Sequence, residues 1–160
     1  MPYSRALQAP LTAYRIGDPL GEHPIWDDGG ARALSGRWHA AGDPVIYASE
    51  RYSTAMLEKL VYLPGRLPPN QHYVELTIPT GVSYEVVNGD ALPGWHAKDG
   101  RVSRAFGTQW VRERRSAILI VPSVVARMER NLIFNASHDD FSRIEAGLET
   151  PVWWDERLFT

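Results

Sequence analysis

The feature that most restricts the fold is the run Ala-Ile-Leu-Ile-Val at residues 117–121, which is apolar at every position and rich in β-branched side chains. A continuous run of this kind is typical of a strand buried on both faces of a sheet. The apolar stretch around it is far shorter than the roughly 20 residues that span a bilayer, and Pro122 interrupts it. The chain is therefore expected to be built on a sheet and not to enter a membrane.

The other apolar patterns predict a mixture of strands and helices. Short apolar or alternating runs predict further strands at residues 12–16, 45–48, 73–78, 82–86 and 131–134. Helical spacing predicts helices at 49–62, with Ser49 as the N-cap, and at 101–113. The segment 17–30 is rich in Gly, Pro and Asp and is expected to be a long loop.

These elements alternate without a regular βαβ rhythm, so we expect an α+β fold, a mixed sheet with flanking helices. The chain has 160 residues, of which 44% are hydrophobic and 22% charged, and this suits one soluble domain over residues 1–160. Its tail, with Phe141, Ile144 and the pair Trp153-Trp154, is expected to pack across the sheet. The first residues show no secretory signal, so we expect a cytoplasmic protein.

Composition and motifs argue against several classes of function. The 17 Lys and Arg against 19 Asp and Glu give a net charge of -2, which disfavours direct nucleic-acid binding and a nuclease. There is no cysteine, and the five histidines show no HExxH or similar spacing, so no metal site is expected. Dinucleotide (GxGxxG), Walker A and GxSxG motifs are also missing from the sequence.

Three segments carry candidate site residues. Arg37 stands beside Trp38, a grouping that suits a phosphate, although a surface Arg lying on a Trp would look the same. Glu58 falls in a helix that is apolar around most of its circumference, so its carboxylate needs a partner or a cleft. The alternative is that Glu58 lies on the solvent-exposed edge of the helix. Tyr47 in the preceding strand would face the same cleft. Ser123 follows the 117–121 strand, where either a site or simple turn chemistry is expected.

Taken together and in order, these segments resemble the RES family, named for its Arg, Glu and Ser, whose members are toxins paired with Xre-type antitoxins. The resemblance lies in seven segments of the sequence: Tyr14-Arg15, Gly36-Arg37-Trp38, Pro44 to Ser49, Leu57-Glu58, Ser103 to Gly107, Val121-Pro122-Ser123, and Asn131 to Asn135 with His138, Asp140 and Phe141. The family is similar in fold to ADP-ribosyltransferases of the diphtheria-toxin type, in agreement with the α+β prediction.

The resemblance implies NAD+ as the substrate and a specific set of site residues, namely Arg15, Arg37, Tyr47, Glu58 and Ser123, with Asn135 and His138 added. Cleavage of NAD+ needs a negative group near the ribose and a grip on the pyrophosphate, so we expect Glu58 to face the ribose, both arginines to pair with phosphate oxygens and Tyr47 to stack on nicotinamide. Ser123 would bind the nicotinamide amide or order the loop around Glu58. Where the family commonly has Asn-Pro and His-Pro, this chain has Asn135-Ala136 and His138-Asp139, so this loop departs from the family pattern.

The expected function is that of the toxin in a type II toxin–antitoxin pair, which cleaves the bond between nicotinamide and ribose in NAD+. Water, phosphate or a protein side chain would accept the ADP-ribose, giving a glycohydrolase, a phosphorylase or a mono-ADP-ribosyltransferase, and the sequence does not choose among them. An Xre-type antitoxin is the expected partner, and DNA binding would belong to it. The alternative is a non-catalytic protein-binding module in which Glu58 is structural.

Overall fold

The computed structural model describes residues 4–160, so residues 1–3 of the expected domain lie outside the described residues. Its strands are β1 (Arg5–Ala6), β2 (Leu11–Gly17), β3 (Val45–Ser49), β4 (His72–Ile78), β5 (Ser83–Val86), β6 (Ile118–Pro122), β7 (Arg130–Asn135), β8 (Glu145–Ala146) and β9 (Thr150–Pro151). Its helices are α1 (Gly29–Ala33), α2 (Tyr52–Leu60) and α3 (Arg101–Arg112), with short 3₁₀ helices η1 (Gly89–Ala91), η2 (Asp139–Arg143) and η3 (Glu156–Leu158).

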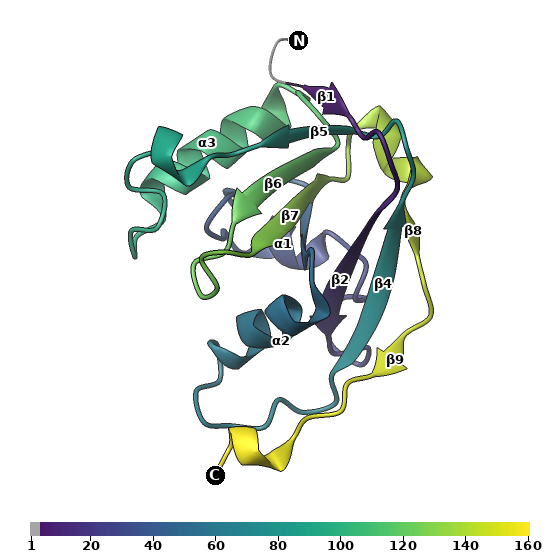
Figure 1. Ribbon diagram of the computed structural model, residues 1–160, viewed down its shortest axis with the longest axis vertical. Helices are drawn as coiled ribbons and strands as arrows, with labels where there is room; N and C mark the ends of the chain where they lie inside the picture. The colour runs from purple at the N-terminus through teal and green to yellow at the C-terminus, as the bar shows by residue number, and fades with distance from the viewer. Residues whose placement is uncertain (1–3) are drawn as a thin grey trace.

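The strands form one mixed sheet in the order β1-β5-β6-β7-β3-β2-β4-β8, with β9 also paired to β4 (Figure 1). β5 and β6 run parallel, whereas the other described pairs are antiparallel. The predicted α+β class with a mixed sheet and flanking helices is therefore confirmed.

The sheet consists of two halves that meet at one point. β2 pairs with β4 along seven positions, and β3 pairs with β7 along five. β2 and β3, by contrast, pair only where Tyr14 faces Ser49. The two neighbouring strands thus diverge from this junction, and α2 follows directly after it in the chain.

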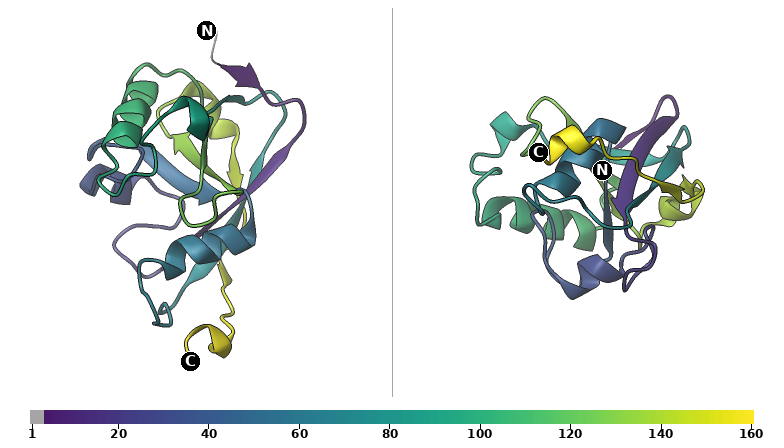
Figure 2. Two further views of the ribbon diagram at one scale, coloured as in Figure 1. Left: turned by 60° about the vertical axis from the view of Figure 1, so that its left-hand side comes forward. Right: turned by 90° about the horizontal axis from the view of Figure 1, so that it is seen from below.

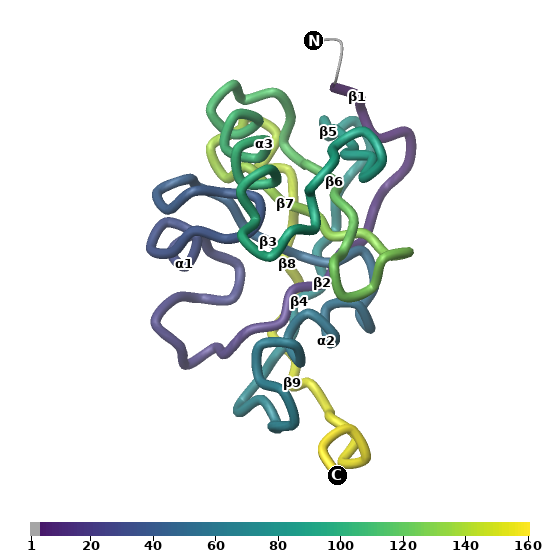
Figure 3. Tube along the Cα trace, turned by 90° about the vertical axis from the view of Figure 1, so that its left-hand side faces the viewer, coloured from purple at the N-terminus to yellow at the C-terminus, as the bar shows by residue number. Residues whose placement is uncertain are grey.

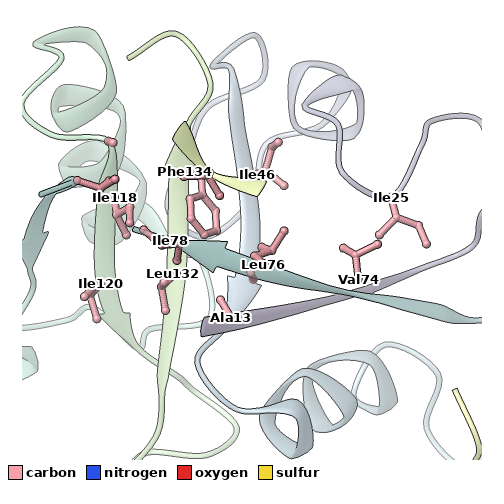
Figure 4. Packing of buried hydrophobic residues seen from close by; sticks show 14 residues of the cluster. Ala13, Ile25, Ile46, Val74, Leu76, Ile78, Ile118, Ile120, Leu132 and Phe134 are labelled. Carbon is pink, nitrogen blue, oxygen red and sulfur yellow. The ribbon is translucent and has the colours of Figure 1, made fainter. Parts of the chain in front are cut away.

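The run at 117–121 lies at the centre of the core, as predicted. Alternate side chains of β6 enter different clusters: Ile118 and Ile120 pack with Phe134 and Leu76 on one face (Figure 4), and Leu119 packs with the α3 side on the other. The second cluster is covered by residues of α3 and by Trp38. Burial on both faces explains why this strand is apolar at every position.

Helix α3 presents a narrow buried face to this second cluster. Ser103, Gly107, Trp110 and Val111 are buried and recur at helical spacing. The indole nitrogen of Trp110 donates to Ser116 Oγ at 2.8 Å, which satisfies the one polar atom of this buried side chain. Gly107 lies directly against the backbone of Trp38, and this contact brings α3 onto the segment that carries Arg37.

Three local predictions need correction. Helix α2 begins at Tyr52 with Arg51 as N-cap, and Ser49 ends β3, where its hydroxyl donates to Asn131 Oδ1 at 2.7 Å and is not available as a cap. The predicted loop 17–30 runs into a short helix, α1. The tail packs on the sheet only in part: Ile144 is buried in the first core cluster and Phe141 packs against it, whereas β8 and β9 pair along β4.

The aromatic residues of the tail differ in their surroundings. Trp154 is buried, whereas Trp153 is 77% exposed. Phe141 stacks on Trp26 with ring centroids 5.3 Å apart. Within residues 4–160, none of the helices has the length and apolar character needed to cross a membrane.

Candidate active site

Two adjoining cavities open where the two halves of the sheet diverge. The smaller holds about 240 Å³ and the larger about 520 Å³. They share four lining residues, Tyr47, Glu58, Tyr62 and Asn131, so they form one continuous cleft. Their combined size falls in the range of pockets that hold small organic ligands and cofactors.

Glu58 stands at the junction of the two cavities. It lies in the last turns of α2, and its Oε1 accepts hydrogen bonds from Ser123 Oγ at 2.8 Å and from Asn131 Nδ2 at 3.2 Å. No group within residues 4–160 donates to Oε2. One carboxylate oxygen is thus held in place while the other can accept a hydrogen bond from a ligand.

Ser123 is fully buried and lines neither cavity. Its hydroxyl donates to Glu58 and accepts from the backbone N–H of Ala126 at 3.1 Å. The loop between β6 and β7 therefore lies beside α2, as Figures 1, 2 and 3 all show. Of the two roles considered for Ser123, this geometry favours the ordering of Glu58 and its loop.

Replacing Ser123 by Ala is expected to lower the free energy of unfolding by about 1 to 2 kcal/mol, because a half-buried carboxylate loses a donor and the loop loses an acceptor. Urea unfolding followed by circular dichroism measures the change. Ser53→Ala, on the exposed side of α2, is the matched control and should stay within about 0.5 kcal/mol of wild type. Equal stability of the two variants would contradict the anchoring role.

Arg37 reaches the larger cavity from a tight turn in which Gly36 and His39 form a β-bridge. Its Nη1 donates to the carbonyl oxygens of Trp95 at 3.0 Å and Ala97 at 2.7 Å. Within residues 4–160, no acceptor is bonded to its Nε or Nη2. The guanidinium is thus fixed at one nitrogen and keeps two for an anion.

Tyr47 contributes to both cavities from the middle of β3. Its hydroxyl accepts from the backbone N–H of Trp38 at 3.0 Å and lies 2.7 Å from His39 Nδ1. Burial raises the pKa of the Tyr47 phenol far above its usual value, so the side chain stays neutral at physiological pH. Stacking of Tyr47 on nicotinamide stays a prediction.

The smaller cavity has two cationic side chains, Arg15 from β2 and Lys59 from α2. Arg15 donates from Nε to the carbonyl of Ile25 and from Nη1 to that of Tyr47 at 2.7 Å. Burial lowers the pKa of Arg15 to about 10. Burial also lowers the pKa of Lys59, and the positive charge of Arg15 lowers it further. Arg15 remains charged at neutral pH, so this cavity favours an anion.

Asn135 and His138, which are also predicted to contact NAD+, line neither of the two cavities. Asn135 is fully buried at the far end of β7, four residues or about 13 Å along the strand from Asn131. Its amide donates to the Val111 carbonyl and its oxygen accepts from Ser137. His138 Nδ1 accepts from the backbone N–H of Asp140 and caps η2.

Sequence reasoning missed several cleft residues, chiefly Asn131, Tyr62 and Lys59. Asn131 was visible as a polar residue at the start of an apolar strand, which is a weak signal. Tyr62 was predicted as part of the helix 49–62 and not as a site residue, whereas α2 ends at Leu60 and Tyr62 is 80% exposed beyond it. Among residues 4–160, no group of three or more His, Cys, Asp or Glu is placed to hold a metal ion.

Comparisons with known proteins agree with this picture. The family model described as "RES domain" matches residues 12–155. A curated relative from Sphingobium sp. (strain YBL2), named "Prs ADP-ribosylating toxin", is 40% identical over 134 residues, which cover 81% of this chain and 83% of the relative. Another from Pseudomonas putida, named "Toxin Res", is 35% identical over 136 residues, covering 82% and 90%.

A solved structure shares the fold. The chain superposes with a TM-score of 0.70 on a chain from the "Crystal structure of the M.tuberculosis MbcT-MbcA toxin-antitoxin complex", at 14% identity and covering 92% of this chain and 86% of that one. The family model spans nearly the whole sequence, and two relatives exceed 30% identity over most of their length. The resemblance found in the sequence is therefore confirmed, and the chain belongs to the RES domain family of toxins.

Proposed function

We propose that this protein is the toxin of a toxin–antitoxin pair and that it cleaves the nicotinamide–ribose bond of NAD+ and transfers the ADP-ribose to a protein. The observation that carries the proposal is the convergence of Glu58 and Arg37 on one cavity, although they lie 21 residues apart in the sequence. A relative with 40% identity is named an ADP-ribosylating toxin, which supports the proposal.

Glu58 is assigned to the ribose. When the glycosidic bond breaks, nicotinamide leaves as a neutral molecule with the bonding electrons, and the ribose carbon develops positive charge as in glycoside hydrolysis. The Oε2 of Glu58 accepts a hydrogen bond from a ribose hydroxyl and stabilises this charge, while Oε1 stays bound to Ser123 and Asn131. The acceptor then forms a bond to the ribose carbon and loses its proton to solvent.

The remaining side chains are assigned to binding. Arg37, with two nitrogens that have no partner among residues 4–160, pairs with a phosphate oxygen. Arg15 supplies a second positive charge from the other side of Glu58. Tyr47 lines both cavities and offers its ring to the nicotinamide. Ser123 acts through Glu58, which it holds in position.

The partner is proposed to be an Xre-type antitoxin, with both proteins in the cytoplasm. A solved structure that shares this fold is that of a toxin–antitoxin complex, and two curated relatives are named toxins. An active toxin needs a partner that keeps it inactive in growing cells, so expression of this chain alone should arrest growth. Water and phosphate are the competing acceptors of the ADP-ribose, and labelling of a protein would distinguish transfer to protein from both.

Purified wild-type protein is expected to release nicotinamide from NAD+ and, with NAD+ labelled in the adenylate, to label a protein in a cell extract. Arg37→Ala should raise the KM for NAD+ by about tenfold to a hundredfold, because a charge-assisted bond to phosphate is lost. Chromatography of nicotinamide and gel analysis of the label measure both reactions.

Arg32→Ala is the matched control, because Arg32 lies on α1, pairs with Asp28 and lines neither cavity. It should leave the KM unchanged. Nicotinamide release without protein labelling would assign water or phosphate as the acceptor and reject protein transfer. No release and no labelling would favour the non-catalytic binding module.

A further inference from the structure

A buried histidine outside the cleft is bonded to a residue that lines it. His39 is 2% exposed and belongs to the lining of neither cavity. Its Nε2 lies 2.9 Å from the carbonyl oxygen of Ala31 and 2.8 Å from that of Leu34. Carbonyl oxygens only accept hydrogen bonds, so Nε2 carries the proton. In the neutral ring Nδ1 is then an acceptor, and the hydroxyl of Tyr47 at 2.7 Å donates to it.

The hydroxyl of Tyr47 therefore makes two bonds to the same turn. It donates to His39 Nδ1 and accepts from the backbone N–H of Trp38. The hydroxyl and the imidazole pack directly against Gly36 and leave no room for a side chain there, because a Cβ at position 36 would lie 2.9 Å from both Tyr47 Oη and His39 Cε1. The backbone N–H of Gly36 donates to the His39 carbonyl at 3.1 Å. Strand β3 is thus tied to the turn 36–39 through one hydroxyl group.

The hydrogen bonds of the Tyr47 hydroxyl fix two parts of the cleft, the Tyr47 ring and the turn that carries Arg37. Arg37 lies inside the turn, and the ring of Tyr47 lines both cavities. Without His39 the hydroxyl proton of the partly buried Tyr47 has no acceptor among its described partners, and a desolvated polar group without a partner is costly. The phenol would then turn to find another partner, and this would release Trp38 and loosen the turn around Arg37.

We propose that His39 is a positioning residue which, through the hydroxyl of Tyr47, fixes both the Tyr47 ring and the Arg37 turn for binding NAD+. This inference rests on the proposed function for its ligand, but its geometry stands on the hydrogen bonds alone. It predicts an effect on NAD+ affinity that exceeds any effect on the chemical step, because Glu58 is held separately by Ser123 and Asn131.

The test compares His39→Leu with His39→Gln, measuring kcat and KM for NAD+. Gln supplies one donor and one acceptor and should stay within about threefold of wild type, whereas Leu supplies neither and should raise KM by about tenfold with a smaller change in kcat. Tyr47→Phe removes the same hydroxyl and should raise KM similarly. The double variant His39→Leu with Tyr47→Phe should be no worse than the more impaired single variant.

Several results would overturn the inference. One is an unchanged KM in Tyr47→Phe, which applies even if His39→Leu fails to fold. Another is a double variant whose KM increases multiply, because independent residues behave in that way. A third is a loss of thermal stability in His39→Leu with unchanged KM, which would make His39 merely structural.

Calorimetric titration with NAD+ separates this inference from the proposed function. If wild type binds NAD+ without releasing nicotinamide, the proposed activity fails, and the same variants then test His39 through their affinity. A weaker affinity in His39→Leu that His39→Gln restores supports the inference in either case. Wild type that neither cleaves nor binds NAD+ would overturn both.

Discussion

Glu58→Gln is expected to lower the rate of nicotinamide release from NAD+ by about a hundredfold to a thousandfold, with little change in stability. The amide oxygen of Gln can still accept from Ser123 and Asn131, which donate to Oε1 in the wild type. Under the proposed function, Gln would place no negative charge beside the ribose, and the stabilisation of the positive charge that forms in the transition state would be lost. Single-turnover measurement of nicotinamide release, together with a thermal melt, checks both parts.

Glu75→Gln is the matched control for this experiment. Glu75 is exposed on β4 and lines neither cavity, so the same change of charge should leave the rate within about twofold of wild type. Equal rates in wild type and Glu58→Gln would remove Glu58 from the reaction. A large loss of stability in Glu58→Gln would mean that its charge is needed for the fold.

Gly107→Ala is expected to destabilise the protein by more than about 3 kcal/mol, enough to prevent most of it from folding at 37 °C. A Cβ at position 107 would lie 1.7 Å from the carbonyl oxygen of Trp38 and 2.7 Å from its carbonyl carbon. These are backbone atoms, so α3 as a whole would have to move. The better helix propensity of Ala, about 1 kcal/mol, is too small to compensate. Urea unfolding and the yield of soluble protein measure the effect.

Gly30→Ala is the control for Gly107→Ala, because Gly30 lies inside α1 and a Cβ there meets nothing within 4 Å. It should be neutral or stabilising by up to about 1 kcal/mol. Similar stability of the two variants would show that α3 does not need its close contact with Trp38. Since Trp38 is next to Arg37, partly folded Gly107→Ala protein should also bind NAD+ poorly.

The central strands could be predicted from the sequence because their patterns reflect burial directly. The run at 117–121 is apolar because β6 is covered on both faces, and β4 alternates because only one of its faces is buried. The two-residue strands β1, β8 and β9 are too short to carry a period. Ser49 was mistaken for a cap because a hydroxyl before a helix suits one, yet its pairing with Asn131 extends β3 to that residue.

The cleft could be predicted only in part. Nothing local indicates that Glu58 on α2 and Arg37 in a turn share a cavity, since this follows from the pairing of β3 with β7 and from the packing of α3 on Trp38. The family resemblance identified these two residues. It also pointed to Asn135 and His138, whose side chains instead satisfy local backbone groups at the other end of β7. Asn131 and Asn135 belong to the same segment of the family pattern, but they lie at opposite ends of β7, and only Asn131 lines the cleft.

The single backbone pair between β2 and β3 has a consequence for the stability of the toxin in the cell. With only Tyr14 opposite Ser49 at this seam, little backbone bonding links the two half-sheets there. Arg15 lies on β2 and Tyr47 on β3, and Arg15 donates to the Tyr47 carbonyl. Under the proposed function, NAD+ bound to both side chains would add a second link between the two half-sheets. By mass action, NAD+ at a hundred times its Kd would add about 2.7 kcal/mol to stability. The toxin would then lose this stabilisation as it consumes the NAD+ of the cell. Cellular proteases would degrade it faster, so its activity would limit its own lifetime.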